Sequence, residues 1–192
     1  MLSCTRKGDL GTVNMNLRMQ SALNPPSPQK REKQLREKIF REEDKVMQIR
    51  NNYDAEWVEE EREENSGFGV FNGDIGTIVS IDHSDESVTV NFDGKLVRYG
   101  FDELDEIEHA FAVTVHKSQG SEYPVVILPV LNPPPMLSTR NLLYTAVTRA
   151  KKMAILVGDR LSVDRMVSNN RKAERYTGLG EMYRIFKENA SC

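Results

Sequence analysis

The residues best suited to chemistry lie between Thr114 and Tyr123. This segment gathers hydroxyl, imidazole, amide and carboxylate side chains and a glycine into ten residues, directly after an apolar stretch. Open α/β sheets bind ligands in the loops that follow the carboxyl ends of their strands. The side chains, together with the backbone N–H groups around Gly120, suit contacts with phosphates and sugars. On residue types alone, a polar loop that merely joins two strands is an equally good interpretation.

A second segment, from Leu142 to Lys152, combines an apolar helix face with a basic end. Leu143 and Val147 are four residues apart, so a helix over residues 140–150 would seat both on a sheet. Arg149 would then be held near the end of that helix. A guanidinium so placed can stabilise charge on a γ-phosphoryl group in the transition state. The residues alone favour a simpler role, in which the arginine serves the helix dipole.

Strands and a helix are expected to position both segments. The apolar runs at residues 110–116, 124–131 and 153–157 are predicted to be strands, and the second is expected to be buried on both faces. With the helix over 140–150 between the last two, this order predicts an α/β layer. Residues 1–5 are expected to be the end of another buried strand, which suggests that the chain is an excised segment.

The first third of the chain is predicted to be helical and charged. Spacing over residues 10–23 indicates a helix with Thr12 as its cap, which ends before Pro25. The charged stretch 29–43 is expected to be an exposed helix or linker. The glutamate-rich stretch 56–64 is expected to be a solvated loop or a short helix.

From residue 70 the pattern changes to short antiparallel strands. Asp93 and Gly94 form a strong hairpin signal, because both central residues of such a turn need positive φ. Two sets of alternating residues are each expected to share a face: Ile75, Thr77, Val79 and Ile81, and then Val88, Val90 and Phe92. Short strands with Gly and Asp turns suggest a small SH3-like barrel inserted in the α/β layer.

Composition narrows the class of protein. The 192 residues are 39% hydrophobic and 29% charged, as expected of a soluble globular protein. The net charge of −3 argues against coating nucleic acid by bulk electrostatics, but it permits a local groove for a few phosphates. No apolar run approaches the roughly 20 residues that span a bilayer, so a cytoplasmic protein without a membrane partner is expected. The two cysteines, Cys4 and Cys192, predict neither a disulfide scaffold nor a structural zinc site.

Together the two chemical segments resemble motifs V and VI of superfamily 1 helicases, in the versions of the RecD/TraA group. Other blocks resemble that group in the correct order: Thr5–Gly8, Asn16–Leu17, Leu23–Pro25, Asp44–Tyr53 and Val70–Gly76. The resemblance implies an α/β, RecA-like domain of the P-loop NTPase type, with a parallel sheet, over residues 1–43 and 108–192. It places an inserted SH3-like β-barrel at residues 44–107. Glu43, where the group usually has glycine, and a long acidic insert at 56–66 depart from the pattern.

The resemblance also implies an ATP-facing set of residues. Arg149 would be the arginine finger of motif VI, supported by Tyr144 and Thr145. Three residues of motif V would lie near the nucleotide: Gln119, Gly120 and Glu122. Gln119 would help to link nucleotide state to movement, and Glu122 would accept hydrogen bonds from a ribose hydroxyl.

On the DNA side, the resemblance implies that Thr114 and His116 face single-stranded DNA through its phosphates. Arg6 and Lys7 are weaker candidates for phosphate contacts. The expected partners are single-stranded DNA and an N-terminal RecA-like domain of the same parent protein, which would act as a monomer. Movement in the 5′-to-3′ direction follows from the resemblance alone.

Two motifs that bind Mg-ATP are missing from the sequence. A G-x-x-x-x-G-K-[ST] loop is absent, since Lys95 follows Gly94 but Leu96 takes the hydroxyl position. Asp102-Glu103 and Asp105-Glu106 follow Tyr99-Gly100-Phe101 and not a strand of four aliphatic residues, so we expect a surface turn and no magnesium-binding pair there. ATP and Mg²⁺ are therefore expected in the full-length protein, with Mg²⁺ bound by no residue of this chain, and the chain alone is expected to be inactive.

Two other functions fit the same residues. The SH3-like region could be a protein-binding module with the α/β remainder as scaffold. The phosphate-contacting segments could also belong to a relative that acts on RNA or in conjugation. A pull-down by the SH3-like region alone would favour the first, and a substrate assay would separate the second.

Overall fold

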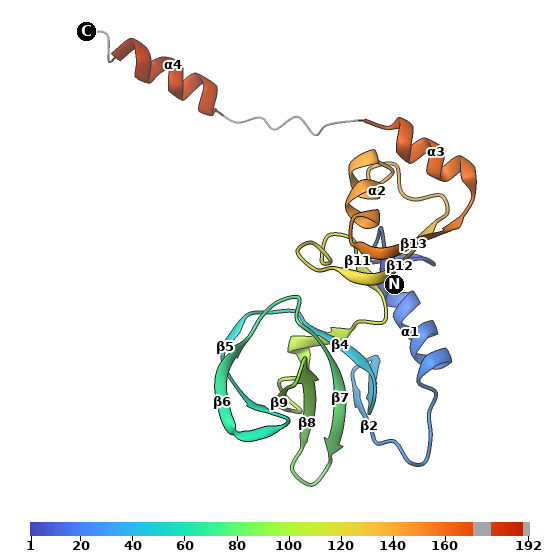
Figure 1. Cartoon of the computed structure of the whole chain (residues 1–192), viewed down its shortest axis with the longest axis vertical. Helices are drawn as coiled ribbons and strands as arrows, with labels where there is room; N and C mark the ends of the chain where they lie inside the picture. The colour runs from blue at the N-terminus through green and yellow to red at the C-terminus, as the bar shows by residue number, and fades with distance from the viewer. Residues whose placement is uncertain (171–177, 190–192) are drawn as a thin grey trace.

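The computed structural model describes residues 1–170 and 178–189, except for the side chains of residues 62–64, 181, 185, 188 and 189. Cys192 lies outside these residues, and Cys4 is a free, buried thiol. Figure 1 shows two regions, one of mixed helices and strands and one of strands. We call them the α/β region (β1, α1, β11 to β13, α2 and α3) and the β region (β2 to β10). No helix among the described residues is long and apolar enough to span a membrane.

The α/β region is built on parallel strand pairs. Strand β1 (Leu2–Ser3) pairs with β11 (Val113–Thr114), and β12 (Tyr123–Val130) pairs with β13 (Ala150–Gly158). Strand β1 also packs beside β12. Helices α2 (Arg140–Val147) and α3 (Arg160–Ser168) pack on this sheet and on each other. Their shared core is formed by Val126, Leu128, Val130, Leu142, Leu143, Ala146 and Met166.

The structure describes two further helices. Helix α1 (Thr12–Leu23) confirms the helix expected over residues 10–23, but its N-cap is Gly11, so Thr12 is the first helical residue and not the cap. Helix α4 (Leu179–Asn189) exposes a row of apolar side chains that includes Leu179, Met182, Tyr183 and Phe186.

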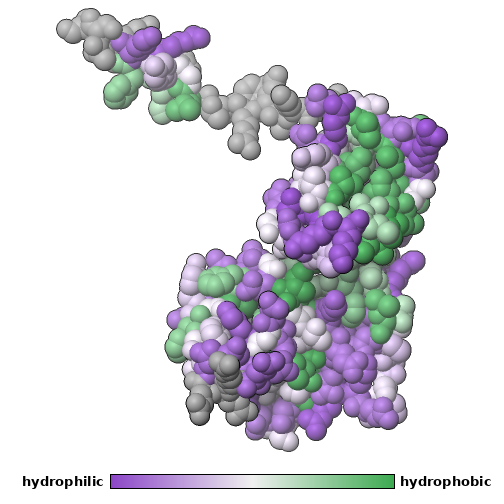
Figure 2. All heavy atoms as spheres, viewed as in Figure 1, coloured by the Kyte–Doolittle hydropathy of each residue, from purple (hydrophilic) through white to green (hydrophobic). Residues whose placement is uncertain are grey.

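Strand β12 is buried on one face only, contrary to the sequence prediction. Val126 and Leu128 are almost fully buried, whereas Val125 and Ile127 on the other face are 47% and 39% exposed. The helices α2 and α3 cover the first face, and no described element covers the second. Figure 2 shows the resulting apolar surface over the α/β region, beside the mostly polar surface of the β region.

The β region is a seven-stranded antiparallel sheet in the order β10-β4-β7-β8-β9-β5-β6. Its strands are β4 (Lys45–Gln48), β5 (Asn52–Glu59), β6 (Arg62–Val70), β7 (Ile75–Asp82), β8 (Ser87–Phe92), β9 (Lys95–Gly100) and β10 (Ile107–His109). A short 3-10 turn (Leu104–Glu106) leads into β10. Asp93 and Gly94 have φ of 53° and 87°, which confirms the predicted hairpin between β8 and β9.

The glutamate-rich stretch 56–64 is not a loop or a helix. It forms the ends of β5 and β6, because Trp57 and Val58 pair with Val97 and Leu96 of β9. Trp57 lies against Gly67, where any Cβ would come within 2.5 Å of the indole ring. Packing of the indole across the sheet therefore outweighs the local preference of the glutamates.

The charged stretch 29–43 is a hairpin and not a helix. Strand β2 (Glu32–Leu35) pairs with β3 (Lys38–Arg41) around a turn in which Arg36 has φ of 54°. In a helix, Glu32 and Arg41 would lie far apart along the axis. In the hairpin they lie directly opposite each other and form an ion pair. Phe40 of β3 is fully buried in the core of the β region, and this burial fixes the hairpin.

Strand β7 also departs from the predicted alternation. The expected face included Ile75, Thr77, Val79 and Ile81, but a β-bulge between Ile78 and Ser80 shifts the register. As a result Ile78 and Ile81 are buried, while Val79 is 48% exposed. The second predicted set, Val88, Val90 and Phe92, is buried as expected.

The carboxylate of Asp159 caps α3, so its removal tests the stability of the α/β region. It accepts hydrogen bonds from the Ser162 hydroxyl and the Ser162 N–H, each at 2.7 Å. These bonds hold the pKa of Asp159 below its usual value. A depressed pKa stabilises the fold above the unfolded pKa and loses that effect as pH falls. We expect Asp159→Ala to lower the free energy of unfolding at pH 7, with a difference from the unsubstituted chain that shrinks below about pH 4. Urea unfolding at several pH values measures this, and a difference independent of pH contradicts it.

Candidate functional site

A tight turn after β11 presents the first chemical segment. The Lys117 and Ser118 N–H groups bond to the hydroxyl and carbonyl oxygens of Thr114, at 3.2 and 3.1 Å. The Ser118 hydroxyl, which is buried, donates to the carbonyl of Val115. Val115 and Ser118 therefore anchor the turn, and the side chains of His116, Lys117 and Gln119 between and after them are exposed.

Helix α2 positions the second segment. Thr139 caps its start by accepting the N–H of Leu142, and Leu142, Leu143 and Ala146 bury its inner face. The helix ends at Val147, and the Arg149 N–H still bonds to the carbonyl of Ala146 at 3.2 Å. Leu143 is buried, as predicted, and its burial anchors α2. Arg149 follows the C-cap residue Thr148 of this helix.

The guanidinium of Arg149 bridges the two segments. Its Nε donates to the Thr145 carbonyl at 3.3 Å, and its Nη1 donates to the Ser121 carbonyl at the same distance. Its Nη2 lies 3.4 Å from the Thr148 hydroxyl. None of the described carboxylates lies within 4.0 Å of this guanidinium. Arg149 is therefore a half-buried, permanent cation held only by neutral oxygens.

The other predicted ATP-facing residues lie around this bridge. Glu122 forms an ion pair with Lys151 at 3.2 Å, and both side chains are more than half exposed. Gly120 has φ of 87° and faces open space, as a glycine at the tip of an exposed loop can. Tyr144 is 68% exposed and reaches Arg149 only through Thr148, whose hydroxyl bonds to the Tyr144 carbonyl.

A pocket of about 230 Å³ joins the turn to helix α2. His116 and Gln119 line it from the turn, and Asn141 and Thr145 line it from the helix. Met136, Leu137 and Leu142 also line it, so the pocket presents both polar and apolar side chains. His116, which the resemblance assigns to DNA, thus shares a pocket with Gln119, which it assigns to the nucleotide.

The predicted DNA-facing residues line three different pockets, of which the one lined by His116 is described above. Arg6 and Thr114 line a small pocket together with Lys117, and Arg6 pairs with Glu108 at 2.5 Å. Lys7 instead lines a different pocket, of about 380 Å³, beside the proline-rich turn at residues 129–134. The sequence pattern predicted no role for Lys117, although this residue lies in the segment between Thr114 and Tyr123.

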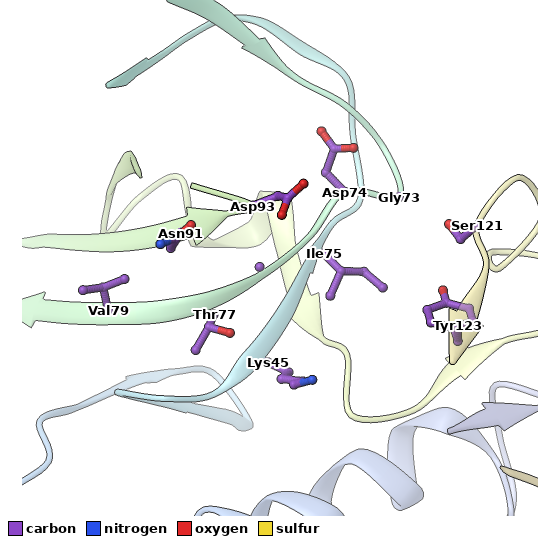
Figure 3. A pocket seen from close by; sticks show the side chains of 11 residues that line it. Lys45, Gly73, Asp74, Ile75, Thr77, Val79, Asn91, Asp93, Ser121 and Tyr123 are labelled. Carbon is purple, nitrogen blue, oxygen red and sulfur yellow. The ribbon is translucent and has the colours of Figure 1, made fainter. Parts of the chain in front are cut away.

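A wider groove of about 690 Å³ separates the β region from the loop at Ser121 and Tyr123 (Figure 3). Its lining from the β region includes Lys45 and the carboxylates of Asp74 and Asp93. Carboxylates repel phosphates, and none of the residues predicted to bind nucleotide or DNA lines the groove. We therefore place the candidate site at the turn and helix α2, and not in this groove.

Comparison with known protein families identifies two domains. The SH3 domain of ATP-dependent RecD-like DNA helicases matches residues 15–92, and the UvrD-like helicase C-terminal domain matches residues 109–157. The first match covers helix α1 and most of the β region. The second covers β11 to β13 and α2, which carry the candidate site.

Individual relatives agree with these matches. The ATP-dependent RecD2 DNA helicase of Deinococcus radiodurans is 34% identical over 186 residues, which are 96% of this chain and 23% of that protein. The RecBCD enzyme subunit RecD of Mycobacterium tuberculosis is 39% identical over 114 residues, 59% of this chain and 19% of that protein. The chain thus spans about a fifth of the length of the curated relatives it matches.

A solved structure shares the fold. The Pif1 helicase from Bacteroides in complex with ADP-AlF3 and ssDNA superimposes with a TM-score of 0.52 at 17% sequence identity. The alignment covers 97% of this chain and 45% of that protein. At this identity the likeness concerns the fold alone, a mixed α/β arrangement with the β region attached.

Proposed function

This chain belongs to the RecD-like DNA helicases of superfamily 1, as its motifs indicated, and from that premise we propose that it forms half of an ATP-driven DNA motor. In this proposal the α/β region is the second RecA-like domain, and the β region is its inserted SH3-like barrel. A first RecA-like domain supplies the phosphate-binding loop that this sequence lacks. ATP binds between the two domains.

The proposal rests on one observation: the guanidinium of Arg149 is half-buried and has no carboxylate partner among the described residues. A half-buried guanidinium without a carboxylate partner is electrostatically costly unless an anion approaches it. Contacts to the Thr145 and Ser121 carbonyls orient its fork without cancelling its charge. Such a group can stabilise the γ-phosphoryl oxygens of a nucleotide held by the opposite domain. Arg149 would thereby act as the arginine finger.

The neighbouring residues fit one side of a nucleotide. The carboxylate of Glu122 can accept hydrogen bonds from a ribose, once Lys151 moves aside, and Gly120 leaves its backbone open to a close approach. Gln119 lines the pocket toward Thr145, where it can sense closure of the cleft. ATP would supply the transferable phosphoryl group, and Mg²⁺ would be held by the first domain.

Single-stranded DNA would run past the opposite side of the turn. Thr114 and Arg6 line one pocket there, and the exposed imidazole of His116, which lines the pocket shared with Gln119, would be a further DNA contact. Thr114 lies on β11 and Arg149 contacts the end of the same loop at Ser121, so closure of the nucleotide cleft can move the DNA contacts. We propose Lys7 as a further phosphate contact on a separate face. Translocation from 5′ to 3′ completes the proposal.

ATPase assays test the half-motor proposal directly. We expect this chain to show no ATPase activity with or without single-stranded DNA, because it lacks a phosphate-binding loop. The complete helicase, which adds a first motor domain, should hydrolyse ATP and be stimulated by DNA. Robust DNA-stimulated hydrolysis by the 192-residue chain alone would contradict the assignment.

A further inference from the structure

Three cations from three separate elements surround one carboxylate between the α/β and β regions. Glu108 of β10 pairs with Arg6 at 2.5 Å, with Lys117 at 3.6 Å and with Lys38 at 3.7 Å. Arg6 precedes α1, Lys38 begins β3 of the hairpin, and Lys117 lies in the turn after β11. We call these four residues the Glu108 cluster.

The Glu108 cluster carries excess positive charge. Among the described residues, Arg6, Lys38 and Lys117 form no ion pair other than those with Glu108. Three cations against one carboxylate leave a formal charge of +2. The side chains of the cations are 62%, 41% and 36% exposed, whereas that of Glu108 is 22% exposed. The cations thus form the outer, solvent-facing part of the cluster.

Glu108 can be displaced at low cost. Water and salt screen the charges of Arg6, Lys38 and Lys117, which are exposed, so each ion pair with Glu108 is weak. A phosphodiester offers the same kind of anionic oxygen that Glu108 now provides, and arginine and lysine bind it readily. The hydroxyl-bearing Thr114 and Thr12 line the small pocket beside the cluster, of about 30 Å³.

We propose that Arg6, Lys38 and Lys117 form a binding site for one phosphate of single-stranded DNA, and that Glu108 occupies this site when DNA is absent. The inference rests on the proposed function and extends it. It gives the hairpin β2–β3 a role in holding the strand, through Lys38. It also makes Glu108 a built-in competitor that lowers DNA affinity and keeps the three cations facing one another.

Binding of a fluorescein-labelled oligothymidylate to the 192-residue chain, followed by anisotropy at several KCl concentrations, tests this site. Glu108→Gln should tighten binding on the order of fivefold at low salt, since the competitor is gone. Its plot of log affinity against log salt should keep a slope near that of the unsubstituted chain, because the same phosphate is bound in both complexes. Lys38→Gln should weaken binding by a similar factor and make the slope shallower by about 0.7.

Lys33→Gln is the matched control for the hairpin. It removes the same charge from the same hairpin, but the Lys33 ammonium lies over the Phe101 ring, 3.7 Å from its centroid, and not in the cluster. Its affinity and salt slope should stay near those of the unsubstituted chain. Far-ultraviolet circular dichroism checks that every variant is folded.

The outcomes separate this inference from the proposed function. If the unsubstituted chain binds but Lys38→Gln behaves like Lys33→Gln, or Glu108→Gln weakens binding, the phosphate site is wrong and the helicase assignment stands. If Glu108→Gln fails to fold, the comparison of the two lysine variants still decides. If the unsubstituted chain binds no oligonucleotide even at low salt, the proposed DNA contacts fail, and this site fails with them.

Discussion

Replacing Arg149 by alanine should lower the DNA-stimulated ATPase rate of the complete helicase by about a thousandfold or more, the range over which arginine fingers act. Nucleotide affinity should change little, because the finger meets charge that develops on the γ-phosphoryl group during transfer and not in the bound ground state. Single-turnover hydrolysis and equilibrium binding of a fluorescent ATP analogue measure the two quantities separately.

Two further variants make the Arg149 result specific. Arg149→Lys keeps a positive charge but lacks the planar fork that holds the Thr145 and Ser121 carbonyls, so it should recover only a small part of the rate. Arg160→Ala removes an arginine whose side chain is 94% exposed and whose one ion pair among the described residues is with Asp164 at 3.8 Å, so this variant should hydrolyse ATP normally. Near-normal turnover by Arg149→Ala would remove the arginine-finger assignment.

Replacing Asp44 by alanine should reduce the free energy of unfolding of the chain by about 3 kcal/mol, because it leaves several buried donors without an acceptor. Asp44 is fully buried where the chain enters β4. Its Oδ2 accepts from Gln20 at 2.5 Å and from the Arg41 N–H at 2.8 Å, and lies 3.2 Å from His109 Nε2. Its Oδ1 accepts from Asn24 at 2.8 Å.

This network joins the two regions, because its residues come from both of them. Gln20 and Asn24 belong to α1, whereas His109 ends β10, where the chain leaves the β region. Asn16 of α1 reinforces the joint by bonding to the carbonyls of His109 and Ala112. The start of β4 and the end of β10 are therefore both attached to one helix of the α/β region.

Urea unfolding of the 192-residue chain measures the effect of Asp44→Ala. Asp85→Ala is the matched control, because Asp85 is exposed and its one ion pair among the described residues is with the exposed Arg98 at 2.9 Å. That control should change the free energy of unfolding by no more than about 0.5 kcal/mol. A loss below about 1 kcal/mol for Asp44→Ala would mean that the buried donors find other acceptors.

Local patterns predicted the elements whose stability depends on near neighbours in sequence. The hairpin at Asp93 and Gly94 follows from the positive φ that its two turn residues tolerate. The α1, α2 and β13 segments follow from apolar spacing over a few turns or residues. The motifs, taken together, indicate the family from the sequence alone.

Elements that depend on distant partners were predicted wrongly. Residues 32–41 have the charge pattern of a helix, yet burial of Phe40 in the β region makes them a hairpin. Residues 56–64 are rich in glutamate, yet pairing of Trp57 with Val97 makes them strands. The faces of β7 moved because of a bulge that no alternation of residue types reveals.

The sequence by itself determined the family of this protein, the order of its chemical segments and the absence of a phosphate-binding loop, because these are properties of residue types in series. Only the tertiary structure decided that Arg149 reaches Ser121, 28 residues away, without a carboxylate partner. It also decided that Arg6 meets Glu108 across 102 residues, with Lys38 and Lys117 beside them. Such contacts follow from strand pairing and core packing, which bring together segments that are far apart in the sequence.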